Sequence, residues 1–325
     1  MSLTNFPYGI SSFGVPVLGG MFPFTGKYIF VKPYSGLDGN DGLSPDKAVK
    51  TLTKALAVAT ADKNDVVFLI AESNTAASTT DYQSATLDWN KDGVHIIGIN
   101  AGPMFSHRSR VALISTYVTA SNLFTLSADG CFISNVSFFA GVADANPTGC
   151  FNLTGMRNVI ASCHIAGIGN DANDIAGAYS LRIAGAENFI TNSVIGLDTI
   201  DRGSAANSEI YVPTGATRNL VKDSYIVSRL QHSTNSPQVR VAGGAMGNPG
   251  LLVGFDGCRF LNSSTNYGYA QTYVVVHTAA PTAGFMLIEN CVGVGATNWG
   301  VAGNNLILHN SATNTGYTFG VGYSS

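Results

Sequence analysis

Residues 159–167 of this 325-residue chain have the sequence VIASCHIAG, and variants of this stretch recur along most of the sequence. Aligned on Cys163, the related stretches are FISNVSFFAG from residue 132, FITNSVIG from 189, LVKDSYIVS from 220, GFDGCRFLN from 254, LIENCVGVG from 287 and ILHNSATN from 307. The steps between equivalent anchor residues are 27, 30, 31, 34, 33 and 20 residues. Internal repeats of this length are typical of solenoid proteins, in which each repeat forms one coil.

Four aligned columns show what each position does. The column three residues before the anchor is apolar in every copy: Ile133, Ile160, Ile190, Val221, Phe255, Ile288 and Leu308. The column directly before the anchor holds only Asn, Ser, Asp or Gly: Asn135, Ser162, Asn192, Asp223, Gly257, Asn290 and Asn310. These four residue types suit left-handed backbone conformations and tight bends. We therefore expect a bend before each anchor, which lets the small anchor and the apolar residue two positions later both point inward.

A second short strand recurs in each copy, and its side chains alternate between inward and outward. Its sequences are FNL from residue 151, LRI from 181, IYV from 210, VRV from 239 and VVV from 274. One bend and two or three short strands per coil predict an all-β fold, a single-stranded parallel β-helix over residues 94–312. Cys163, Cys258 and Cys291 are then inert core thiols, and His164, between two inward positions, is expected on the surface.

The composition agrees with strands and turns, and it excludes several classes of function. Charged residues make up 11% of the chain and glycine accounts for 37 residues, which disfavours a helical bundle. The net charge of −3 and the lack of a basic run argue against a nucleic-acid partner. No stretch approaches the roughly 18 apolar residues of a membrane span. The five cysteines form no CxxC pair, so we expect no metal site and no cofactor.

Residues 26–93 are predicted to form the first strands and a capping helix. KYIFVK at 27–32 and DVVFLI at 65–70 have the composition of short buried strands. Between them, Ser44 is expected as the N-cap of a helix and Pro45 as its first residue. Val49, Leu52, Leu56 and Ala59 follow at helical spacing and would form its buried face.

The stretch GLDGNDGLSPDKAVKTLTKALAVATADKNDVVFLI at residues 36–70 resembles the first segment of proteins of the pectate-lyase-like superfamily. The resemblance covers residues 28–312 and implies a right-handed β-helix. It leaves function open, because this superfamily includes lyases, hydrolases, phage tailspikes and structural proteins.

Residues 1–25 contain no charged residue, three prolines, five aromatic residues and four glycines, and no helix or strand period. We interpret this segment as an extended arm that packs on another molecule, or alternatively along its own domain. Within it, LTNFPYGISSFGVPV at 3–17 resembles an opening shared by structural proteins of tailed phages. Tyr8 stands where that pattern usually has Asn.

This second resemblance implies a capsid decoration (cement) protein of a phage head, assembled in the host cytoplasm and without enzymatic activity. The expected partners are the major capsid protein or other virion proteins, with a glycan as a further possibility. The outward positions carry few charges, so a monomer would expose much apolar surface. Right-handed β-helices commonly form parallel trimers, and the resemblance therefore implies a homotrimer. We expect the uncharged tail 313–325 to pack across its subunits. The expected capsid contacts are Phe6, Pro7, Phe13, Val15 and Pro16.

The alternative is a tailspike-like polysaccharide-degrading enzyme, a glycoside hydrolase or lyase, or a carbohydrate-binding spike without catalysis. Asp171 and Asp174 follow one copy of the repeat, and Asp198 and Asp201 follow the next. Loops of successive coils lie about 5 Å apart, and glycoside hydrolysis needs two carboxyl groups about 5–10 Å apart. The more ordinary interpretation is that these residues lie in solvent loops or subunit contacts. The Asp-Asp, Gly-His-Gly and Arg-x-Lys signatures typical of the superfamily's hydrolases do not occur.

Overall fold

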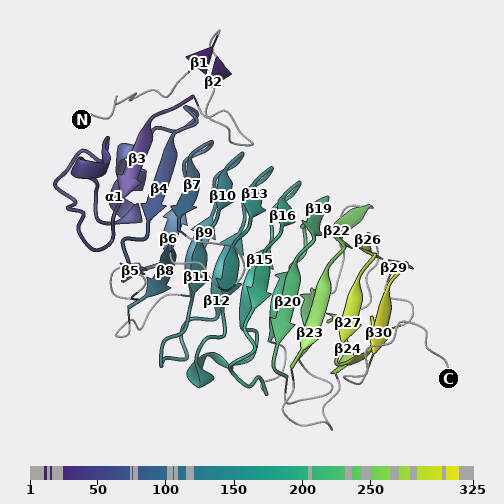
Figure 1. The fold of residues 1–325 in the computed structure, drawn as a ribbon. Helices are drawn as coiled ribbons and strands as arrows, with labels where there is room; N and C mark the ends of the chain where they lie inside the picture. The colour runs from purple at the N-terminus through teal and green to yellow at the C-terminus, as the bar shows by residue number, and fades with distance from the viewer. Residues whose placement is uncertain are drawn as a thin grey trace.

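The computed structural model describes residues 11–12, 15–16, 25–73, 75, 80–100, 105, 109–114, 121–203, 207–230, 236–242, 250–263, 271–278, 284–301 and 305–314. Over these residues the chain forms a parallel β-helix whose coils stack along one axis (Figure 1). Each coil contributes strands to three long sheets, which we call sheet 1, sheet 2 and sheet 3 in the order in which a coil visits them. The predicted fold class is confirmed.

Sheet 1 has ten strands, and neighbours in it are parallel. They are β3 (Tyr28–Val31), β4 (Val66–Ile70), β7 (His95–Ile99), β10 (Phe132–Ser134), β13 (Val159–Ala161), β16 (Phe189–Thr191), β19 (Asn219–Lys222), β22 (Leu251–Asp256), β26 (Phe285–Glu289) and β29 (Leu306–His309). Sheet 2 has nine strands. They are β5 (Thr80–Gln83), β8 (Arg110–Leu113), β11 (Ser137–Phe139), β14 (His164–Ala166), β17 (Val194–Gly196), β20 (Tyr225–Ser228), β23 (Arg259–Asn262), β27 (Val292–Val294) and β30 (Ala312–Asn314).

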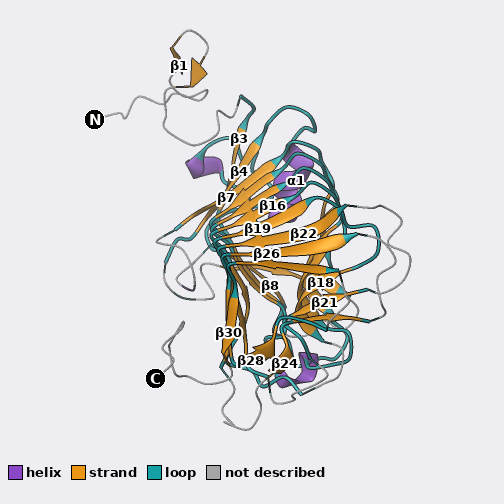
Figure 2. Ribbon diagram, turned by 90° about the vertical axis from the view of Figure 1, so that its right-hand side faces the viewer, coloured by secondary structure: helices purple, strands orange, loops and turns teal. Residues whose placement is uncertain are grey.

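Sheet 3 has seven strands, and longer loops join it to sheet 2 (Figure 2). Its strands are β6 (Leu87–Trp89), β9 (Asn122–Leu126), β12 (Gly149–Leu153), β15 (Tyr179–Ile183), β18 (Ser208–Val212), β21 (Val239–Val241) and β25 (Val275–His277). Two small pairs complete the strands: β24 (Gln271–Tyr273) with β28 (Ala296–Asn298), and β1 (Ser11–Ser12) with β2 (Val15–Pro16). Among the described residues, the helical segments are η1 (Pro45–Lys47), α1 (Leu52–Val58) and η3 (Asp171–Asn173).

The corner between sheets 1 and 2 is a single left-handed residue in every copy of the repeat, as predicted. The seven residues before the anchors, from Asn135 to Asn310, all have φ between 46° and 64°. The anchor side chains form a hydrogen-bonded ladder along the axis. The backbone N–H of Cys163 donates to Ser193 Oγ over 3.1 Å, and that of Ser193 donates to Ser224 Oγ over 3.2 Å. The small anchors therefore satisfy backbone groups that the bend leaves without partners.

The corner between sheets 3 and 1 carries a second ladder, which the sequence reasoning missed. Asn158, Asn188 and Asn219 stack in successive coils and are buried. The N–H of Asn158 donates to Asn188 Oδ1 over 2.9 Å, and that of Asn188 donates to Asn219 Oδ1 over 3.0 Å. Each carboxamide also donates to a carbonyl of the preceding coil. The signal was present in the sequence as an Asn five residues before three of the anchors.

Apolar side chains from all three sheets fill the interior. Phe124, Phe138 and Phe151 pack together with ring centroids 4.8–4.9 Å apart, so the centre of the coil is solid. Cys163, Cys258 and Cys291 are buried there with no disulfide, as predicted. Among the described residues, no helix is long and apolar enough to cross a membrane.

The N-terminal end differs from the prediction in two ways. Ser44 makes no capping hydrogen bond, and the chain forms only the short η1 there. The helix instead begins after Thr51, whose side chain accepts from the Lys54 N–H over 3.1 Å. Because β3 and β4 already belong to sheet 1, the β-helix starts at Tyr28 and not at residue 94, the predicted boundary.

His164 lies on the outer side of sheet 2 but is not a surface residue. It is 8% exposed, and its Nε2 lies 3.2 Å from the carbonyl oxygen of Gly196. The ring of Phe105 packs edge-on against it, with centroids 5.2 Å apart. The alternation predicted its direction correctly, but Phe105, which is distant in sequence, covers it.

We expect Asn188→Ala to lower the free energy of unfolding by about 2–5 kcal/mol. Two buried backbone groups, the N–H of Asn158 and the carbonyl of Gly155, lose their partners, and each such loss costs about 1–3 kcal/mol. Equilibrium unfolding in urea measures the change. Thr191→Ala, on the outward side of β16, is the control and should change stability by less than about 1 kcal/mol. Equal losses in the two variants would contradict the ladder's role.

Candidate functional site

The outer face of sheet 3 carries one polar or aromatic residue per coil in a continuous row. Asn152, Arg182, Tyr211 and Arg240 stand opposite one another on β12, β15, β18 and β21. All four are half-buried, whereas their neighbours along the strands point into the core. We call these four residues the sheet 3 face. They are the middle letters of the triplets FNL, LRI, IYV and VRV, so the alternation did place them outward, although their joint chemistry was not recognised.

Two guanidinium groups flank one aromatic ring on this face. The Cζ of Arg240 lies 4.1 Å from the ring centroid of Tyr211, and the Cζ of Arg182 lies 5.9 Å from it on the neighbouring strand. Arg182 Nη1 donates to Asn152 Oδ1 over 2.8 Å, which fixes the direction of that side chain. The face therefore combines fixed cations with an aromatic surface, an arrangement that suits a flat, anionic ligand.

Burial changes the titration of two groups at this face. It lowers the pKa of Arg240, which stays cationic at neutral pH because an arginine begins from such a high value. It raises the pKa of Tyr179 to about 12, so this phenol, whose ring lies 6.2 Å from that of Tyr211, stays neutral. Arg240 Nη2 also donates to the carbonyl oxygen of Gly177 over 3.2 Å and so holds the loop after η3 beside the face.

Beside the face, at the beginning of β15 and β18, a buried polar network joins residues of two loops to β18. Arg202 forms an ion pair with Glu209 and donates to Asn207, and both charged side chains are 1% exposed. Ser180 donates to the other oxygen of Glu209. Burial raises the pKa of Glu209, and the Arg202 guanidinium opposes that rise. Because the ion pair is buried away from solvent, we assign the network a structural role in holding Arg202 and Asn207 against β18.

The four predicted loop carboxylates divide into two pairs. Asp174 accepts from the N–H of Gly203 over 2.8 Å and from the side chain of Asn207, so it belongs to the buried network. Asp201 pairs with Arg229 over 2.5 Å. Asp171, at the start of η3, and Asp198 are exposed. The structure thus commits one carboxylate of each loop to structural contacts and leaves the other facing solvent.

Phe6, Pro7 and Phe13 lie outside the described residues, and Val15 and Pro16 form β2. The capsid partner, the homotrimer and the virion location stay predictions. Among the described residues, no group of three or more His, Cys, Asp or Glu side chains could hold a metal ion.

The fold matches solved structures of polysaccharide-acting enzymes. A pectin methylesterase variant in complex with a hexasaccharide matches with a TM-score of 0.60 and 12% identity over 90% of each chain. The pectin methylesterase from carrot has a TM-score of 0.57 and 14% identity, covering 89% of this chain and 84% of its own. Pectate lyase Pel9A has a TM-score of 0.52 and 13% identity, covering 92% of this chain and 74% of its own. No protein-family model matches the sequence, and no curated protein matches it.

These neighbours establish the right-handed parallel β-helix of the pectate lyase and pectin methylesterase type. The expectation that the protein has no enzymatic activity is corrected, because the structural neighbours process carbohydrates. The virion resemblance of residues 3–17 is not shown by any comparison. That expectation depended on residues 3–17, whereas the match to the solved structures covers about 90% of this chain.

We expect Glu209→Gln to destabilise the protein by about 3–5 kcal/mol, because it leaves the Arg202 charge buried without its counter-charge. The double variant Arg202→Met/Glu209→Gln should recover part of this loss, since it removes both charges together. Thermal and urea unfolding measure both. The exposed pair Arg157–Glu187 provides the control, and Arg157→Ala should cost less than about 1 kcal/mol. A double variant no more stable than Glu209→Gln would argue against the pair as the source of the effect.

Proposed function

We propose that the protein is an enzyme that degrades an anionic polysaccharide, which it binds along the sheet 3 face. The observation that carries this proposal is the placement of Arg182, Tyr211 and Arg240 on three successive coils. The fold neighbours support it, since their names identify them as pectin methylesterases and a pectate lyase.

The geometry of the face suits a chain of acidic sugars. Aromatic rings pack against the apolar side of a sugar ring, and a guanidinium pairs with a carboxylate through parallel hydrogen bonds. Neighbouring strands lie about 4.8 Å apart, which is close to the length that one sugar occupies in a polysaccharide. A polymer lying along the helix axis would therefore present successive sugars to Arg182, Tyr211 and Arg240 in turn.

The exposed carboxylates Asp171 and Asp198 supply the candidate chemistry. Their loops leave β14 and β17 and lead directly into β15 and β18, the strands that carry Arg182 and Tyr211. The contact between Arg240 and Gly177 holds the first loop beside the face. A pair of carboxyl groups can cleave a glycosidic bond by hydrolysis, one protonating the leaving oxygen and the other attacking the sugar or activating water. A single carboxylate could instead act as the base of an elimination, with Arg182 or Arg240 neutralising the uronate carboxylate.

The phage-like sequence of residues 3–17 suggests a more specific version of this proposal, in which the enzyme is part of a phage particle. If the phage resemblance holds, the enzyme would be a tailspike-like component of the particle, with the arm as its attachment. Polysaccharide degradation does not depend on that location. Proteomic detection of the chain in purified particles would support the more specific version, and its absence from them would remove it.

We expect the double variant Arg182→Ala/Tyr211→Ala to bind polygalacturonate at least about tenfold more weakly, because it removes one charge-assisted contact and one stacking surface. Binding by the unaltered protein should weaken with added salt, as a charge-based contact requires. Isothermal titration calorimetry with polygalacturonate and with a neutral glucan measures both effects. Arg157→Ala, which removes an exposed cation at a corner, should bind as the unaltered protein does. Unchanged affinity in the double variant would exclude the sheet 3 face.

The catalytic role of Asp171 and Asp198 is tested separately, by measuring kcat. Asp171→Asn/Asp198→Asn should lower kcat on acidic polysaccharides by about a hundredfold or more while binding is retained, because these groups would take part only in proton transfer or attack. The assay measures new reducing ends and unsaturated products over a panel of acidic polysaccharides. Asp46→Asn, an exposed substitution on η1, is the matched control. Full activity in the double variant would remove these residues from the mechanism.

A further inference from the structure

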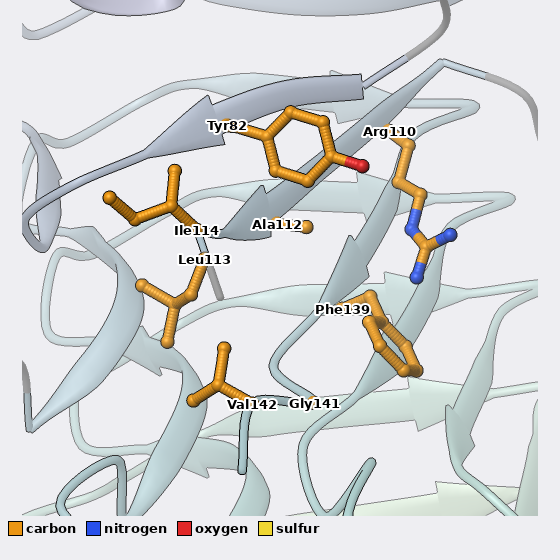
Figure 3. A pocket seen from close by; sticks show the side chains of 8 residues that line it. All are labelled: Tyr82, Arg110, Ala112, Leu113, Ile114, Phe139, Gly141 and Val142. Carbon is orange, nitrogen blue, oxygen red and sulfur yellow. The ribbon is translucent and has the colours of Figure 1, made fainter. Parts of the chain in front are cut away.

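A hollow lies on the outer side of sheet 2, at β5, β8 and β11, and the function proposed above does not use it. Its volume is about 440 Å³, within the range of small-molecule sites. Tyr82, Arg110 and Phe139 form its walls, and Ala112, Leu113 and Val142 contribute apolar surface (Figure 3). Since it lies on a different sheet from the sheet 3 face, its role is independent of the function proposed above.

The pairing register explains why a hollow forms here. Tyr82, Ala112 and Phe139 stand opposite one another on three successive strands, all facing outward. The methyl group of Ala112 is far smaller than either ring, so a slot opens between the two aromatic side chains. The slot is open to ligands on the Tyr82 side, where that side chain is 47% exposed.

The opposite wall is a fixed stack. The guanidinium Cζ of Arg110 lies 4.2 Å from the ring centroid of Phe139. A Cβ at Gly141 would come within 2.4 Å of the same ring, so the absence of a side chain at Gly141 is what lets Phe139 lie flat there. The ring is held between Gly141 and Arg110, and the guanidinium is thereby placed at the edge of the slot.

The two ends of the hollow differ in polarity. Figure 3 shows the hydroxyl of Tyr82 directed toward the side of the hollow where Arg110 lies, with Leu113, Ile114 and Val142 away from it. Arg110 and Tyr82 are the two polar side chains among the eight residues that line it. A sugar would bury hydroxyl groups against the apolar end without hydrogen-bond partners, which disfavours its binding there. A ligand with one anionic head and an apolar body avoids that cost.

We propose that this hollow binds a small carboxylate with a flat apolar body, with the carboxylate on Arg110 and the Tyr82 hydroxyl and the body against Ala112, Leu113 and Val142. Guanidinium and phenol then both donate to carboxylate oxygens, and the flat body fits the slot that Ala112 leaves. Simple aryl carboxylates have this shape and charge.

The experiment uses trans-cinnamate as the probe and cinnamamide as its uncharged isostere, with binding to the full chain followed by calorimetry and by saturation-transfer NMR. Cinnamate should bind at least about tenfold more tightly than cinnamamide, because only the anion forms charge-assisted hydrogen bonds. Arg110→Gln should remove this difference. Tyr82→Phe, which keeps the ring and loses the hydroxyl, should weaken cinnamate several-fold and leave cinnamamide unchanged.

Arg259→Gln is the matched control, because Arg259 lies on the same row of sheet 2 and over an aromatic ring, 5.1 Å from the centroid of Tyr225. It should leave cinnamate binding unchanged, and circular dichroism checks that each variant is folded. Equal affinity for cinnamate and cinnamamide, or equal losses in Arg110→Gln and Arg259→Gln, would overturn the proposal. So would binding of galacturonate in this hollow with no binding of cinnamate.

Discussion

The structure depends on how each coil satisfies its backbone hydrogen bonds at the corners. A corner interrupts the pairing of the sheets, and every buried N–H that loses its partner there destabilises the fold. Two ladders resolve this: anchor hydroxyls and thiols at one corner, and buried asparagines at the other. In each ladder, the acceptor is supplied by the next coil. A coil is therefore complete only when its neighbour is in place, which couples the stability of neighbouring coils.

The same constraint separates the residues that specify the fold from those free to carry chemistry. Inward columns and corners are fixed by packing and by the ladders, whereas outward rows only have to tolerate strand geometry. The residues of an outward row follow one another at the spacing of neighbouring strands. Suitable side chains on three successive coils therefore form a continuous surface. The sheet 3 face and the hollow on sheet 2 are both of this kind. One is cationic and lies along the axis, and the other is a short slot with an apolar end.

Much of the coil could be predicted from the sequence, because its determinants recur. The structure confirms the bend residues in all seven copies. It confirms the inward column three residues before the anchor in six copies, whereas Leu308, in the last strand of sheet 1, is 48% exposed. Features that depend on contacts distant in sequence were missed. Ser44 was chosen as the helix cap on local pattern alone, but Asp38 accepts from the N–H groups of Lys50 and Thr51, and Asp81 accepts from that of Leu52. These long-range contacts move the start of the helix to Thr51, just as Phe105 removes His164 from the surface.

The roles of the loop carboxylates could not be predicted from the sequence. The sequence placed four aspartates on two successive loops, but it contained nothing to distinguish those held in structural contacts from those facing solvent. Asp174 and Asp201 are held by neighbouring coils, and that restraint positions the loops from which Asp171 and Asp198 project. The fold neighbours share only 12–14% identity with this chain, because only the corners and the core are needed for the fold. Many different sequences can satisfy the corners and the core, so activity must be argued from the outward residues of this chain.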